Sequence, residues 1–151
     1  MINGEVIGSV KVEARLQELS KEMHEGVAKA MFALTIELQR IIKEEKLSGQ
    51  VLKTRTSNLR NSISYEFNND GTNIDGVVGT NVNAIPYARI HEFGGIIEAK
   101  KAKFLRFKIG NRWVMKRSVK IPERSYLRTA LKDLEPKIQN TITEYLGGFA
   151  I

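Results

Sequence analysis

The 151-residue chain contains no cysteine, and it has only three prolines and one tryptophan. Without a thiol, the protein can form no disulfide, no thiolate metal site and no thiol nucleophile. Its two histidines, His24 and His91, lie far apart and lack the spacing of a zinc motif. The sequence therefore predicts no metal and no cofactor, and it predicts that packing alone holds the chain together.

Long apolar runs are also missing. The longest nearly apolar stretches, such as Ala30 to Ile36, are too short to cross a bilayer, and the N-terminal MINGEVIGS lacks the pattern of a signal peptide. Hydrophobic residues make up 42% and charged residues 27% of the chain, as in ordinary globular proteins. We expect one domain, residues 1–151, made in the cytoplasm and without membrane contact.

Acidic residues are scarce in the C-terminal third. Residues 1–50 carry a net charge of −1, residues 51–100 carry 0, and residues 101–151 carry +8. The cations are densest from Lys100 to Lys120, a stretch without any acid. Such a field attracts polyanions, nucleic acid above all, although a solvated hairpin with ordinary surface lysines remains the alternative interpretation. The candidates for contact with DNA or with an acidic partner are Lys103, Arg106, Lys108, Arg112, Lys116 and Arg117.

Apolar periodicity predicts the order helix, strands, helix. Steps of three and four indicate helices, with Gly26 as a candidate break in the first and Pro136 as a candidate kink in the last. Alternation around turn signals indicates two hairpins. The predicted elements are a long helix at about 10–47, hairpins at about 61–80 and about 102–118, a short helix at about 86–93 and a C-terminal helix at about 124–146.

Residues 87–95, YARIHEFGG, place His91 beside Glu92 and close to Arg89, which suggests an acid, a base and a substrate clamp. No serine elbow or phosphate-binding loop accompanies them, and the spacing of the nearby carboxylates does not favour a two-metal site. The sequence therefore predicts no catalytic residue, and His91 is interpreted as a packing or hydrogen-bonding residue.

The same segment has an architectural interpretation. Tyr87, Ile90 and Phe93 would form the apolar face of a short buried helix, which the following two glycines end. Arg89 and Glu92 share another face and are candidates for an ion pair.

Three segments follow one another along the chain: TRTSNLRNSI at 54–63, YARIHEFGG at 87–95 and IPERSYLRTAL at 121–131. Together they resemble the tail-completion, or neck, proteins of tailed bacteriophages, small head–tail joining components also grouped as virion morphogenesis proteins. Ser57 stands where that family usually has Gly, and Ser125 and Tyr126 stand where Pro and Phe are usual. The family-like residues, interpreted as structural, are Leu59, Arg60, Ser62, Tyr87, Ala88, Glu92, Phe93, Gly94, Pro122, Arg124 and Leu127.

The resemblance, which covers about residues 10–146, implies an α+β fold with a mostly antiparallel sheet packed against a long N-terminal helix and a C-terminal helix. It also implies a non-enzymatic phage or prophage assembly subunit. Such subunits form homo-oligomeric rings, commonly sixfold, at the head–tail junction around the channel for duplex DNA. The implied partners are head-completion or connector proteins and tail-tube or tail-terminator proteins, and the implied location is the host cytoplasm and then the virion neck or tail.

Two other functions stay open. One is a minor tail structural protein that contacts only virion proteins and no DNA. The other is a basic nucleic-acid-binding or RNA-cleaving, toxin-like module, in which Arg112, His91 and Tyr126 would take part.

Overall fold

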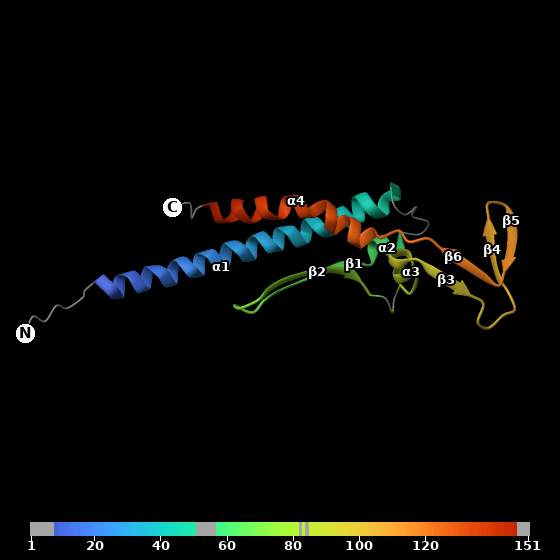
Figure 1. The fold of residues 1–151 in the computed structure, drawn as a ribbon, viewed down its shortest axis with the longest axis horizontal. Coiled ribbons are helices and arrows are strands. Elements are labelled where there is room, and N and C mark those ends of the chain that lie inside the picture. Colours follow the sequence, from blue (N-terminus) through green and yellow to red (C-terminus); the bar gives the residue numbers. More distant parts are fainter. Residues whose placement is uncertain (1–7, 51–56, 82, 84, 148–151) are drawn as a thin grey trace, which may run out of the picture. The chain divides into compact units, whose positions relative to one another are not determined.

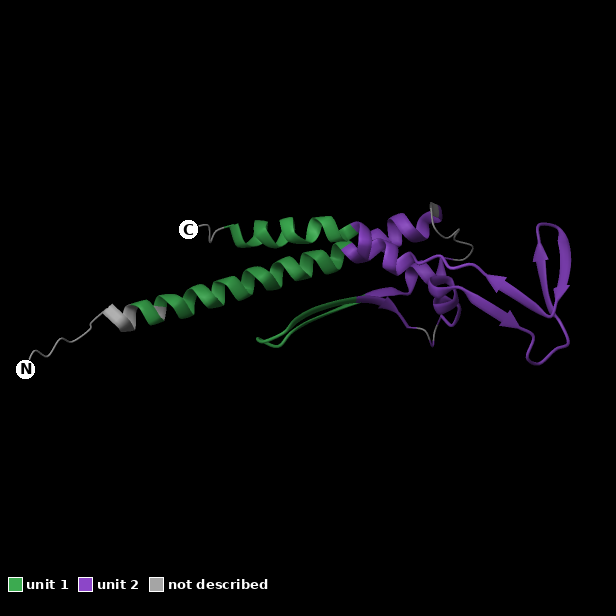
Figure 2. Cartoon of the chain, viewed as in Figure 1, with its two compact units in different colours: residues 1–37, 65–77, 134–151 green, residues 38–64, 78–133 purple. Residues whose placement is uncertain are grey.

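A computed structural model describes residues 8–50, 57–81, 83 and 85–147. The fold class is α+β, as predicted, with a long N-terminal helix, antiparallel two-stranded sheets and a C-terminal helix (Figure 1). The chain divides into two compact units, one of residues 1–37, 65–77 and 134–151 and the other of residues 38–64 and 78–133 (Figure 2). The single-domain organisation stays a prediction.

Helix α1 (Gly8–Arg40) is continuous through Gly26, so the candidate break at that glycine is wrong. In the first unit, a Cβ built on Gly26 would lie 3.0 Å from Leu146 Cδ2 and 3.2 Å from Tyr145 O. The glycine therefore serves close packing against the end of α4 (Tyr126–Leu146). Helix α4 likewise continues past Pro136.

The apolar residues of α1 recur every 11 residues. An 11-residue repeat corresponds to 3.67 residues per turn, close to the 3.6 of an α-helix, so these residues stay on one face over the whole length of the helix. The three successive sets are Val12, Leu16 and Leu19; Met23, Val27 and Ala30; and Leu34, Leu38 and, directly after the helix, Ile41.

Strands β1 (Ile63–Asn69) and β2 (Ile74–Thr80) form a two-stranded ribbon, and in the first unit α1 covers one face of its residues 65–77. The ring of Phe32 packs edge-on against Tyr65 and Phe67, with centroids 6.1 and 5.3 Å away. At the turn, Asp70 accepts hydrogen bonds from the backbone N–H groups of residues 73 and 72, and these bonds hold the pKa of its carboxyl below the usual value.

The second unit contains η1 (Ile41–Gln50, a helical segment with a kink at the non-helical Gly49), α2 (Asn58–Asn61) and α3 (Tyr87–Phe93). It also contains the strands β3 (Gly95–Glu98), β4 (Leu105–Ile109), β5 (Arg112–Lys116) and β6 (Ser118–Ile121). Its buried side chains come from η1, α2, α3, the start of β1 and the first turns of α4. The largest of them are Ile41, Ile42, Leu47, Leu59, Ile63 and Tyr126.

Ser57, which precedes α2, has a φ of 55°. This left-handed region costs little for glycine and more for other residues, which gives a physical reason for glycine at this position in the resembling family. The preceding residues of the first family-like segment, Thr54 to Thr56, lie outside the described residues.

Within the described ranges, no helix is long and apolar enough to cross a membrane. Over the same ranges, no three His, Asp or Glu side chains are grouped so that they could hold a metal ion.

We predict that Gly76→Ala destabilises the first unit. The added Cβ would lie 1.9 Å from Thr35 Oγ1, and Thr35 is buried and held by its 2.7 Å hydrogen bond to Met31 O. Urea unfolding should show a loss of about 1–3 kcal/mol in the free energy of unfolding. Gly79→Ala on the same strand is the control, because no heavy atom lies within 4 Å of its added Cβ. Equal losses for the two variants would contradict the close approach.

Candidate interface: the basic arm and its anchor at Glu92

Residues 95–121 form an arm that runs out along β3 and β4 and returns along β5 and β6 (Figure 1). β3 pairs antiparallel with β6, and β4 with β5. The β3–β6 pairing continues to Ala99, whose N–H bonds Arg117 O at 3.0 Å, while Leu105 already pairs with Lys116. Residues 100–104 are therefore inserted on one side only, which separates the arm into two successive ribbons.

The arm holds nine Lys or Arg residues and one acid, Glu98, so its formal charge is 9 − 1 = +8. Every residue of the arm is described, and none is buried. Large apolar side chains are nevertheless present, and Trp113 and Met115 are 61% and 63% exposed. A two-stranded ribbon is at best marginally stable alone, and exposed apolar side chains beside charges mark a surface for a partner.

The register of β4 and β5 gives the ribbon two different faces. Cross-strand pairs place Arg106, Lys108, Trp113 and Met115 on one side, which we name the cationic face. The Arg106 guanidinium lies over the Trp113 ring, 4.5 Å from its centroid. The opposite side carries Leu105, Phe107, Ile109, Arg112, Val114 and Lys116.

The six candidate cations therefore do not share one face of the arm. Two lie on the cationic face, Arg112 and Lys116 lie on the opposite face, and Lys103 and Arg117 lie near the Phe104 ring, with 6.0 and 5.9 Å from their charged groups to its centroid. Trp113 was not among the predicted site residues. Its stacking under Arg106 depends on the register, which the sequence does not give.

The base of the arm is a buried carboxylate. The buried residues of α3 are Ala88 and Glu92, the latter only 3% exposed. The predicted apolar face of Tyr87, Ile90 and Phe93 is wrong, because Phe93 is 60% exposed and lies under the Arg128 guanidinium, 5.0 Å from its centroid.

Glu92 is buried because it satisfies the first turn of α4. Its carboxylate accepts hydrogen bonds from Leu127 N at 2.8 Å and Arg128 N at 3.2 Å. The Arg128 Nε–H also donates to it at 3.1 Å. The two backbone N–H groups belong to the first turn of α4 and have no acceptor inside the helix. The N-terminal end of a helix also stabilises negative charge. The candidate pair of Glu92 with Arg89 is thus replaced by a pair with Arg128.

Further bonds join the second and third family-like segments. Arg124 N donates to His91 O at 2.9 Å, and Ser125 N donates to Glu92 O at 3.1 Å. Gly94 has a φ of 69°, and a Cβ there would lie 2.7 Å from Glu123 N. The chain therefore leaves α3 and returns to α4 through the same tightly packed base, where Arg128 also bonds Glu123 at 2.6 Å.

Ser125 has a φ of 45° and uses its N–H in this base. Proline, usual here in the resembling family, has a φ near −65° and no N–H, so it could do neither. The next residue, Tyr126, is buried, and burial first and the Glu92 charge second raise the pKa of its phenol to about 12.

The remaining family-like residues have structural positions as well. Leu59 is buried, and Ser62 Oγ donates to its carbonyl at 2.8 Å and lies 2.6 Å from Thr80 Oγ1. Leu127 is partly buried, whereas Arg60, Tyr87, Pro122 and Arg124 are exposed.

The residues suggested for a toxin-like activity lie in different surroundings. Tyr126 is enclosed in the second unit, whereas Arg112 is exposed on the arm. His91 packs edge-on against Tyr87 with centroids 5.8 Å apart. Burial, and then the Arg124 charge, lower the pKa of His91. Both side chains have packing contacts, and among the described residues the buried Nδ1 of His91 has no hydrogen-bond partner.

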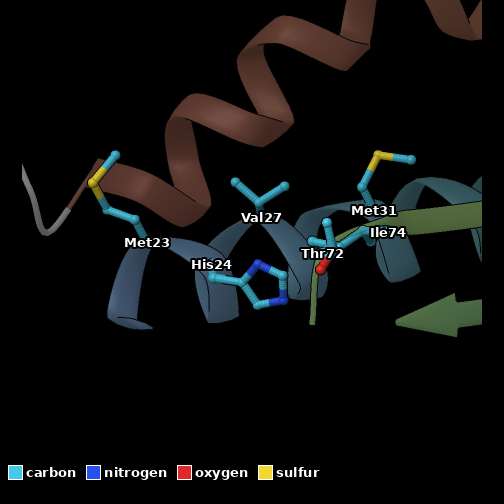
Figure 3. Close-up of a pocket in the computed structure, with 6 residues that line it drawn as sticks. All are labelled: Met23, His24, Val27, Met31, Thr72 and Ile74. Atoms are coloured by element: carbon cyan, nitrogen blue, oxygen red, sulfur yellow. The ribbon is translucent and has the colours of Figure 1, made fainter. Parts of the chain in front are cut away.

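A hollow of about 420 Å³ lies in the first unit (Figure 3). Its lining is mostly apolar, and the polar His24 already has a partner, with Nε2 3.0 Å from Asn69 Oδ1. A small-molecule site needs several polar groups that converge on the ligand, and this hollow lacks them. The lining residues are Met23, His24, Val27, Met31, Thr72 and Ile74.

A family model described as the phage virion morphogenesis family matches residues 33–147, which include the whole arm and its base. No curated protein and no solved structure matches the chain.

We predict that Glu92→Gln destabilises the second unit by about 2–4 kcal/mol in chemical denaturation. The amide keeps the size of the side chain but turns an NH₂ group toward buried donors, and it removes the charge that pairs with Arg128. The control is Glu123→Gln, which removes an exposed carboxylate on the same arginine and should cost less than about 1 kcal/mol. A Glu92→Gln variant as stable as this control would show that the buried carboxylate does not hold the base together.

Proposed function

The chain belongs to the phage virion morphogenesis family, and from this premise we propose that it is a head–tail joining or tail-completion subunit of a phage or prophage. The observation that carries the proposal is the arm, which is fixed at its base by Glu92 and has no buried residue of its own. A surface of this kind becomes stable by contact with another molecule, and assembly supplies that contact. The proposed activity is non-enzymatic.

We propose a homo-oligomeric ring in the virion neck, with sixfold symmetry as the expected form. An arm that docks on a different surface of the next subunit makes a heterologous contact, and such contacts form a ring when the rotation between neighbours closes. The proposed neighbours are head-completion or connector proteins on one side and tail-tube or tail-terminator proteins on the other.

A second candidate is contact of the same arm with duplex DNA, favoured by its nine cations against one acid. Such contacts would go to phosphates and would not read sequence. A minor tail protein without DNA contact is the opposite case, favoured by the exposed Trp113 and Met115, which suit a protein surface better than phosphates.

We predict that phage particles made without this protein accumulate as separate DNA-filled heads and complete tails. Electron microscopy of lysates would count joined particles. The wild-type protein should restore joining, whereas an arm-shortened variant, with residues 100–116 replaced by Asn-Gly between the paired Ala99 and Arg117, should not. A denaturation curve would first establish that the shortened protein is folded. Absence of tails, rather than unjoined tails, would point to a minor tail protein and contradict the joining function.

We predict for the DNA candidate that binding to a short duplex weakens steeply with salt. Replacing Arg106 and Lys108 with Gln should reduce the slope of log Kobs against log[salt] by about 2, since each phosphate contact contributes about 0.9. The matched control replaces Lys21 and Lys29, which lie on α1. If neither the single subunit nor the ring binds the duplex at low salt, the proposed contact with DNA is wrong.

A further inference from the structure

The outer face of the β1–β2 ribbon has no cover in the first unit. Tyr65 and Phe67 point toward Phe32 of α1, so the alternating residues Glu66, Asn68, Asp75 and Val77 belong to the other side, which we name the acidic face. All four are exposed, and Val77 is 58% exposed. Because the ribbon is packed on one side only, these four side chains are accessible to another molecule.

This ribbon has the opposite charge from the arm. Residues 61–88 contain no Lys or Arg, and the ribbon and its turn carry Glu66, Asp70 and Asp75, a formal charge of −3. Among the described residues, Glu66 and Asp75 have no ion-pair partner. The arm, at +8, has cations in excess.

We infer that the cationic face of the arm packs on the acidic face of the β1–β2 ribbon of a second copy of this chain. Arg106 and Lys108 would meet the carboxylates of Glu66 and Asp75, and Trp113 and Met115 would cover Val77. Two twisted ribbons can stack face to face about 10 Å apart, with side chains from both filling the layer between them. Burial of the apolar side chains would supply most of the affinity, and the charges would set the register and exclude wrong partners.

A second copy is the occupant that the charges favour, because each copy carries both complementary surfaces. If each arm docks on a different neighbour, the contact is heterologous and repeats from copy to copy, which gives a ring when the rotation between copies closes. The inference rests on the proposed ring, and it names the surfaces that would build it.

The test uses two charge-reversed proteins. The arm variant carries Arg106→Glu and Lys108→Glu, and the ribbon variant carries Glu66→Lys and Asp75→Lys. All four positions are exposed, so thermal unfolding should be close to wild type. Light scattering over a concentration series should show that wild type assembles and that each variant alone associates at least about tenfold more weakly.

Mixing provides the decisive result. The arm variant has two acidic surfaces and the ribbon variant two basic ones, so an equimolar mixture should assemble again, with the two proteins alternating. A protein that carries all four substitutions should assemble by itself. Because only contact between molecules can produce rescue in the mixture, this result separates a neighbour from a contact within one chain.

A matched control reverses Arg112 and Lys116, which lie on the opposite face of the same ribbon. This control changes the net charge as much as the arm variant does, and it should weaken assembly less.

Three results would overturn the inference: wild type that stays monomeric at every concentration, variants that assemble as well as wild type, or a mixture that is not rescued. If assembly requires duplex DNA and is unchanged by the ribbon substitutions, the arm contacts DNA phosphates rather than the ribbon of a second copy. The joining assay separates this inference from the proposed function, because particles joined by a protein that does not self-associate would retain the function and reject the interface.

Discussion

The carboxylate of Glu92 at the start of α4 is the interaction on which the second unit depends. A buried carboxylate is costly unless hydrogen bonds replace its water, and here two backbone N–H groups and the Arg128 side chain do so. Two of these donors belong to the helix end, which cannot satisfy them itself. The Glu92 carboxylate therefore supplies the hydrogen-bond acceptors that the first turn of α4 lacks, and it holds α3 beside that turn. The close approach at Gly94 follows from that geometry, because only a residue without Cβ fits against Glu123.

The base of the arm stabilises the second unit, whereas the arm beyond it is the surface proposed to contact a partner. The arm beyond it has no buried residue, so substitutions on its surface change little of what holds the unit together. The base, in contrast, combines a buried charge, a left-handed Ser125 and a glycine that touches backbone, and each of these tolerates few alternatives. The second and third family-like segments meet at this base, whereas the arm between them carries the charge.

Periodicity predicted the elements that are long and half-buried. The helices at both ends and the order helix, strands, helix follow from local spacing, because a face repeated over many turns must be covered. The four-residue strands β3 and β6 were missed, since they are short and their pairing joins residues 20 to 26 positions apart. Burial of Glu92 was missed for the same reason, because its partners lie 35 and 36 positions away. The cations could be named from sequence, but their division between two faces needed the register.

The opposite charges of the arm and of the β1–β2 ribbon favour association between copies of the chain. Nine cations on one arm repel one another, and without a core the arm has little to offset that repulsion. A ribbon with three acids and no cation has the complementary excess in the same chain. Contact between such surfaces would bring opposite charges together, with a combined formal charge of 8 − 3 = +5, and would cover Trp113, Met115 and Val77 together. Because neither surface contributes to the core of its own unit, their affinity can be weak in single subunits and become strong in a closed ring, where every contact supports the next.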